Sequence, residues 1–173
     1  AREQAHLVIG FRGLTVHDED RFALEVISQL LAGQGGRLFL ELRDRKGLAY
    51  AVNASNVEGV APGFFAVYIG TAPEKLGEAE RSMQAELERL LESPPPEGEL
   101  QRAKRYLTGN YEIDLQRSSV RAAHLSLDGL YGLGADADRF YAERIGAVGK
   151  EDVLRVARRV VDLAAPTVAV IRP

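Results

Sequence analysis

Arg43 and Tyr50 are the two residues of this chain whose types and spacing suggest chemistry, and they stand seven positions apart. Arg43 lies near the end of an expected short helix over residues 37–45, and Tyr50 follows the Lys46-Gly47 break at the start of an apolar stretch. An arginine offers a rigid fork of hydrogen-bond donors, and a phenol can donate to a carbonyl oxygen or to a developing oxyanion. Neither group has to titrate. Together they could hold a peptide backbone without reading its side chains.

The alternative for this pair is structural. A surface arginine and a half-buried strand tyrosine are common in any globular domain, and spacing alone does not exclude this reading.

A metal site within the chain is not indicated. A zinc-peptidase helix needs two histidines on one face with a glutamate between them to activate water. The three histidines, His6, His17 and His124, form no such pair. The acidic run over residues 17–20 could attract a hard cation, but it fits a helix start equally well. His124 and Asp128 are four apart beside an apolar stripe, which favours a partly buried histidine. We therefore expect this chain to bind no metal on its own.

Nucleotide binding and nucleophilic catalysis are also not supported. The glycines within residues 33–36 resemble a phosphate loop, but Leu38 stands where G-x-G-x-x-G needs its last glycine. A turn between two helices, with a glycine at positive φ, explains them better. Ser118 and Ser119 precede a helical stripe and suit helix caps, and Ser55 falls within a strand pattern. None has a sequence-adjacent histidine to act as a base.

Composition describes an ordinary globular domain. The 173 residues are 46% hydrophobic and 27% charged, and the net charge of -3 gives no reason to expect a nucleic-acid partner. The absence of cysteine excludes a disulfide framework and fits a reducing compartment, which favours the cytoplasm. No apolar run is long enough to span a membrane. The chain begins without methionine and enters a strand pattern almost at once, so we expect residue 1 to be a processing or artificial boundary and the chain to be a fragment.

The elements that must position Arg43 and Tyr50 follow from hydrophobic periodicity. We expect one α+β domain over residues 1–173, with a largely antiparallel sheet packed by helices. The second strand of an expected hairpin, over residues 63–71, is apolar on both faces, which predicts that both are covered, one by helices and the other by something else. The expected strands cover residues 6–11, 49–57, 63–71 and 167–171, and the expected helices begin at Asp18 or Asp20, at 37, just after 73, at about 100, near 120, at 140 and at 153.

A family resemblance rests on the region around Arg43 and Tyr50. Arg37-Leu38-Phe39, Leu42-Arg43 and Gly47-Leu48-Ala49-Tyr50 match a pattern like SRLxxxLRxxxGLxY. Weaker matches are Gly63-Phe64-Phe65, Gly70-Thr71 and Val148 with Glu151-Asp152-Val153. The chain thus resembles the C-terminal domain of the zinc metallopeptidases related to insulinase, pitrilysin and mitochondrial processing peptidase, over nearly its whole length. It departs from the pattern at Gly36, Asp44 and Gly149, but both functional groups remain.

The resemblance implies a clamshell of two halves around a chamber for unfolded peptides. The N-terminal half, or a partner subunit, would bind zinc through an H-x-x-E-H helix and a further glutamate. This chain would be the substrate-binding C-terminal domain, inactive alone and without bound zinc. Arg43 and Tyr50 would contact the peptide backbone near the scissile bond.

Two rival functions stay open. A non-catalytic homologue could serve as a structural or peptide-presenting subunit, and an H-x-x-E-H motif in the complete gene or its neighbour would argue against it. A small-molecule enzyme unrelated to peptides lacks a suitably spaced acid-base pair. Self-association of the chain as a homodimer also stays open.

Overall fold

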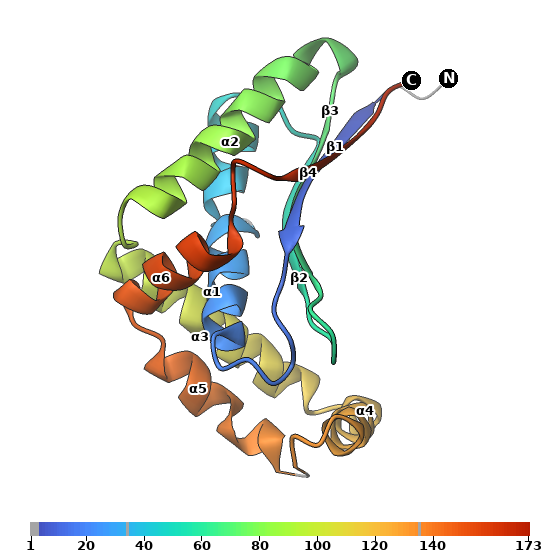
Figure 1. The fold of residues 1–173 in the computed structure, drawn as a ribbon, viewed down its shortest axis with the longest axis vertical. Coiled ribbons are helices and arrows are strands. Elements are labelled where there is room, and N and C mark those ends of the chain that lie inside the picture. The colour runs from blue at the N-terminus through green and yellow to red at the C-terminus, as the bar shows by residue number, and fades with distance from the viewer. Residues whose placement is uncertain (1–3, 34, 135) are drawn as a thin grey trace.

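The computed structural model describes residues 4–33, 35–134 and 136–173 (Figure 1). Its strands are β1 (Ala5–Arg12), β2 (Ala51–Val57), β3 (Phe64–Thr71) and β4 (Thr167–Ile171). Its helices are α1 (Arg21–Leu31), α2 (Leu76–Glu92), α3 (Glu97–Asp114), α4 (Ser118–Leu130), α5 (Tyr141–Ala147) and α6 (Lys150–Val160). Shorter helical pieces are the π-helix η1 (Phe39–Arg45) and the 3₁₀ turns η2 (Pro73–Lys75) and η3 (Ala137–Phe140).

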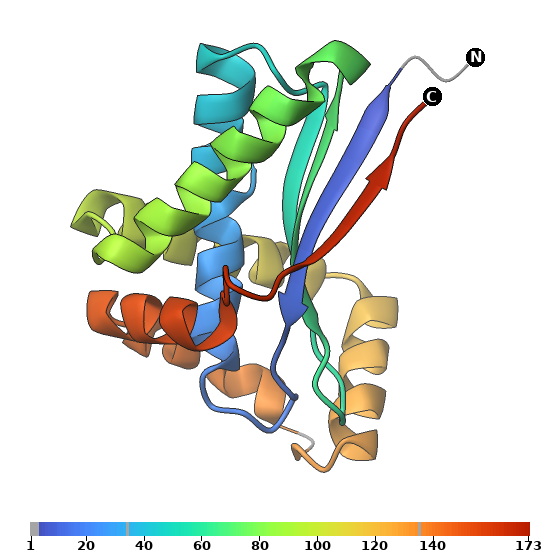
Figure 2. The same cartoon turned by 45° about the horizontal axis from the view of Figure 1, so that its top comes forward.

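The four strands form one antiparallel sheet in the order β2-β3-β1-β4. The hairpin is confirmed, with Ala54 of β2 opposite Val67 of β3. The first and last strands of the chain pair along the other side, with His6 opposite Ile171. The α+β class and the antiparallel sheet are therefore as predicted. Helices α1, α2, α3, α5 and α6 lie on one face of the sheet, whereas α4 stands apart from them beside the tip of the β2-β3 hairpin (Figure 2).

That helix-covered face holds the core. Alternate residues of β1 and β3 point into it and are at most 7% exposed, because successive strand residues face opposite sides. Full burial of one such side chain stabilises the fold by about 1.5–3 kcal/mol. These strand residues are Leu7, Ile9, Phe11, Phe65, Val67 and Ile69.

The opposite face of the sheet is open in the described chain. Phe64 is 48% exposed and Val57 45%, although both are apolar. The helix layer that was predicted for one face of the sheet is present. Among the described residues, only α4 stands near the other face, beside the tip of the β2-β3 hairpin (Figures 1 and 2). No residue of α4 that the structure describes is buried.

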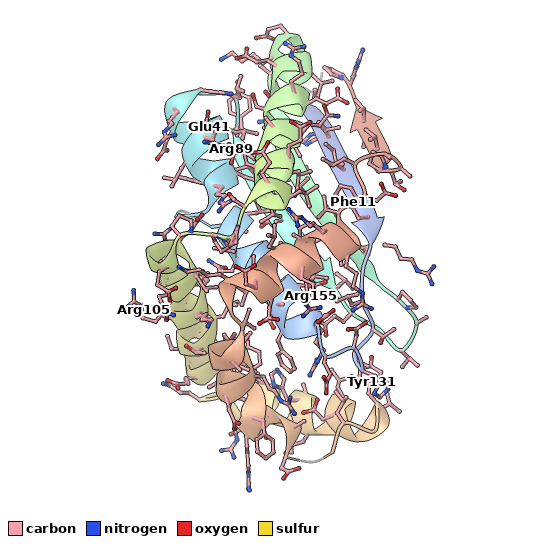
Figure 3. The ribbon with its side chains drawn as sticks, turned by 60° about the vertical axis from the view of Figure 1, so that its left-hand side comes forward. Phe11, Glu41, Arg89, Arg105, Tyr131 and Arg155 are labelled. Atoms are coloured by element: carbon pink, nitrogen blue, oxygen red, sulfur yellow. The ribbon has the colours of Figure 1, made fainter. Side chains whose placement is uncertain are left out.

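The start of α1 corrects one prediction. Asp20 occupies the N-cap position, but its carboxylate makes no capping bond. It accepts instead from Arg155 at 2.8 Å and from Arg159, and Arg159 also donates to Asp18. Both arginines belong to α6, on which Figure 3 labels Arg155. Hydrogen bonds from Arg159 and Arg155 hold the pKa values of Asp18 and Asp20, respectively, below the usual range. The acidic run therefore joins α1 to α6.

The expected serine caps are also corrected. Ser118 and Ser119 are the first two residues of α4, and the N-cap position belongs to Arg117, which makes no side-chain capping bond. By contrast, Gly33 has the expected positive φ, 74°, after α1. None of the helices that the structure describes combines the length and the apolarity that crossing a membrane requires.

Candidate functional site: an arginine and a tyrosine beside the sheet

Arg43 is carried by η1, which the core anchors through fully buried Leu38 and Leu42. These two residues are four apart and face inward, and the residues that follow Leu42, from Arg43 to Gly47, are exposed. The Arg43 side chain is exposed, and its guanidinium carbon lies 5.0 Å from the centre of the Phe39 ring. A cation over an aromatic ring at this distance is attracted to its face. The ring therefore supports the guanidinium while leaving its donors available.

The end of η1 turns the chain sharply toward β2. Gly47 has φ 59°, a conformation that costs little only for glycine. Its N–H donates to the Arg43 carbonyl at 3.1 Å, and the N–H of Leu48 donates to the Leu42 carbonyl at 2.7 Å. Leu48 is itself buried, at 3% exposure. The GL pair of the sequence motif thus closes the helix and returns the chain to the core.

Tyr50 stands just before β2 with its side chain 59% exposed. Its backbone N–H donates to the Gly70 carbonyl of β3 at 2.9 Å. Among the described residues, no hydrogen bond to the phenol is formed. Arg43 and Tyr50 are not hydrogen-bonded to each other either, but the same eight-residue segment, 43–50, carries both and leaves both exposed. This arrangement can offer guanidinium and phenol donors to one extended ligand.

A second pair of polar side chains lies on the open face of the sheet, on β1 and β3. Nδ1 of His6 and the hydroxyl of Tyr68 are 2.9 Å apart, and their rings are stacked. A Cβ at Gly70 would lie 3.0 Å from the Tyr68 hydroxyl, so this pair closes over the glycine whose carbonyl holds Tyr50. Sequence reasoning did not select these residues, because they are 62 positions apart and only the pairing of β1 with β3 unites them.

In the part of the chain that it describes, the structure does not gather metal-binding side chains at His124. No group of three or more His, Cys, Asp or Glu side chains in the described ranges could hold a metal ion. His124 is half-buried, and its Nδ1 lies 3.3 Å from the hydroxyl of Tyr111 on α3. Burial, followed by the charges of nearby carboxylates, raises the pKa of Tyr111 to about 12, so this phenol stays protonated.

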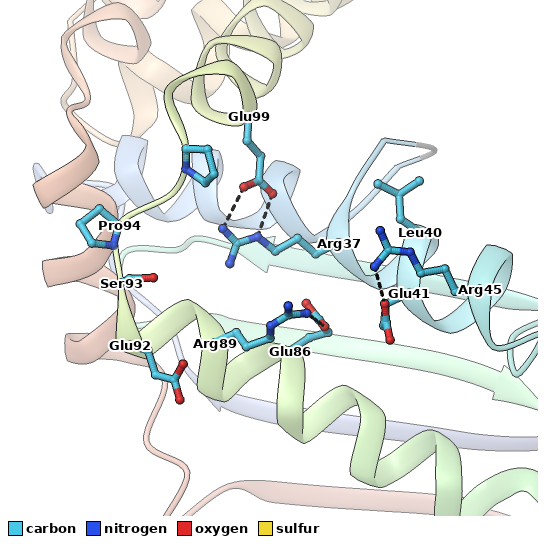
Figure 4. A pocket seen from close by; sticks show the side chains of 11 residues that line it. Arg37, Leu40, Glu41, Arg45, Glu86, Arg89, Glu92, Ser93, Pro94 and Glu99 are labelled. Atoms are coloured by element: carbon cyan, nitrogen blue, oxygen red, sulfur yellow. Dashed lines mark hydrogen bonds and ion pairs between the residues drawn. The ribbon is translucent and has the colours of Figure 1, made fainter.

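A pocket of about 390 Å³ lies between η1, α2 and the proline-rich turn after α2 (Figure 4). Its arginines are already neutralised within the domain. Arg37 donates twice to Glu99, at 2.7 and 2.9 Å, and Arg89 donates to Glu86, also at 2.7 Å. Neither Arg43 nor Tyr50 lines this pocket. We therefore assign it to packing between η1, α2 and α3.

Comparison with known proteins assigns the chain to the same family as the motif around Arg43 and Tyr50. Residues 1–107 match the family model described as the peptidase M16 inactive domain. An uncharacterized zinc protease of Streptomyces coelicolor is 32% identical over 99% of this chain, which spans 37% of that protein. The alpha subunit of the mitochondrial-processing peptidase of Caenorhabditis elegans is 27% identical over 90% of the chain, or 32% of that subunit. The chain therefore spans well under half the length of these curated relatives.

Solved structures share the fold. A Helicobacter pylori protease superposes with a TM-score of 0.89 at 23% identity, covering 99% of this chain and 42% of that one. The inactive peptidase domain of a putative zinc protease from Bordetella parapertussis superposes with a TM-score of 0.88 at 20% identity, covering all of this chain and 94% of that one. Because the family model matches more than half of the sequence, this chain belongs to the peptidase M16 inactive-domain family.

Proposed function

We propose that this chain is the substrate-binding domain of a zinc-dependent metalloendopeptidase, and that an N-terminal half or a partner subunit supplies the zinc. The observation that carries the proposal is the exposure of Arg43 and Tyr50 on one turn whose backbone is anchored in the core. The names of the relatives, which include zinc proteases, support the reaction class.

Within this proposal the substrate is an extended peptide. The phenol of Tyr50 donates a hydrogen bond to a backbone carbonyl near the scissile bond, and the guanidinium of Arg43 donates to a second backbone oxygen. Both donors are free of internal hydrogen bonds among the described residues, so binding requires no internal bond to break. Zinc, held by residues outside this chain, would activate water for the attack on the carbonyl.

The test is hydrolysis of a peptide by this chain reunited with its zinc-bearing region. Tyr50→Phe and Arg43→Ala should each lower kcat/KM by about 10²-fold, the usual effect of losing one transition-state donor. Tyr106→Phe is the matched control, because Tyr106 is similarly exposed, at 52%, but lies on α3. Unchanged hydrolysis in both variants would overturn the proposed roles.

A non-catalytic role has separate support. The family model is described as an inactive domain, and one relative is named as a processing-peptidase subunit. In that case the chain would present or hold peptides, or act as a structural subunit, without hydrolysis in its own complex. Zinc content of the complete protein discriminates the two, since a protein with no stoichiometric zinc supports the non-catalytic role.

A further inference from the structure

The link between η1 and β2 is held by side chains that come from outside it. The hydroxyl of Thr71 donates to the Leu48 carbonyl at 2.5 Å. Lys75 Nζ donates to the neighbouring Gly47 carbonyl at 3.1 Å. The lysine bond is exposed to water and the threonine bond is buried, so the threonine bond is the more costly to lose.

Thr71 is the last residue of β3 and is fully buried, at 0% exposure. The preceding residue, Gly70, accepts the N–H of Tyr50. Two consecutive residues of β3 therefore hold the backbone on both sides of Ala49. The chain then enters β2 at Ala51, the residue after Tyr50, and Ala51 pairs with Gly70 in the sheet register.

This backbone support is what places the Tyr50 phenol. Because the phenol forms no hydrogen bond within the described chain, its position follows from the backbone beneath it and from side-chain packing. An error of about 1 Å in a reacting group can cost about 10²-fold in rate. A site on a turn therefore needs rigid support beneath it.

We infer that Thr71 is a positioning residue for Tyr50, and this inference rests on the proposed function. Its hydroxyl ties the Leu48 carbonyl to the end of β3, so the strand sets the position of the phenol. Serine keeps the donor, whereas valine keeps the shape without it. Thr71→Ser and Thr71→Val thus separate the hydrogen bond from packing.

The functional test is a double-mutant cycle in the reunited peptidase. Thr71→Val should lower kcat/KM by about tenfold or more, mainly through kcat, and Thr71→Ser should restore most of it. In a Tyr50→Phe background, Thr71→Val should have little further effect, because it acts through the missing hydroxyl. Equal losses in both backgrounds would overturn the inference. If Tyr50→Phe alone changes nothing, the proposed function fails instead.

Amide hydrogen exchange of the isolated chain tests the support without any activity. Thr71→Val should speed exchange of the Tyr50 amide by about tenfold relative to the amides that join β1 and β3. Val153→Ala, in the buried face of α6, is the control and should leave this ratio unchanged. An unchanged ratio in Thr71→Val would overturn the positioning role even if the proposed function holds.

Discussion

Glu25 and Tyr141 form a titratable contact between α1 and α5. The Tyr141 hydroxyl donates to Oε1 of Glu25 at 2.6 Å. Burial raises the pKa of Glu25, and the hydrogen bond from Tyr141 opposes this only in part. Burial and the nearby Glu25 charge also raise the pKa of Tyr141, so the phenol remains the donor. The contact therefore makes stability depend on pH.

The sign of this dependence can be tested with Glu25→Gln. A carboxyl group whose pKa is raised by folding stabilises the folded state most at pH values below its unfolded pKa of about 4.3. This stabilisation is lost as the pH rises through the folded-state pKa. Glutamine keeps an acceptor for Tyr141 and does not titrate. From pH 4 to pH 7, the free energy of unfolding of the wild-type chain should therefore fall relative to that of Glu25→Gln. Urea unfolding at both pH values measures it, and a shift in the opposite direction would contradict the assignment.

At the scale of elements, the two edges of the sheet differ. The edge at β2 is blocked at Ala54, whose N–H donates to Asn53 and whose carbonyl accepts from Ser28. The edge at β4 has no comparable cover in the described chain. Val168 and Val170 are 44% and 41% exposed although they point to the same side as the core. An uncharged apolar edge of this kind favours pairing with another strand.

We therefore predict that the isolated chain self-associates through β4. Val168→Lys should lower the association constant by about tenfold or more, because charged edge residues oppose strand pairing. Val57→Lys is a matched control, since Val57 is 45% exposed on the opposite edge strand. Sedimentation velocity over a range of concentrations measures the change. A wild-type chain that stays monomeric, or an equal effect of both substitutions, would contradict the prediction.

Periodicity and the turn residues predicted the helices and strands to within a few positions, since both report local structure. Long-range partners could not be predicted in this way. Asp20 meets Arg155 across 135 positions, so the expected cap became an ion pair. The π-helical bonding of η1 was also missed, because Leu38 and Leu42 fit an α-helix equally well.

At the scale of the whole molecule, the proposed function requires that the zinc and its ligands lie outside this chain. Spacing and resemblance selected Arg43 and Tyr50, and the structure shows that both are exposed on an anchored turn. The sequence alone did not indicate a role for Thr71, because its hydrogen bond to Leu48 depends on strand pairing between distant segments. One face of the sheet is open in the described chain, and the chain spans 37% of the Streptomyces coelicolor relative. Both observations support the proposal that a second half supplies the zinc.

Contact between Tyr50 and the bound peptide can be measured by site-specific photo-crosslinking. A photoreactive phenylalanine at position 50 of the reunited protein should crosslink to a peptide substrate close to its scissile bond. The same residue at position 106 serves as the control, because Tyr106 is about as exposed but lies on α3. We expect a crosslink at position 50 that competing unlabelled peptide abolishes, and none at position 106. Equal labelling at both positions, or none at position 50, would contradict it.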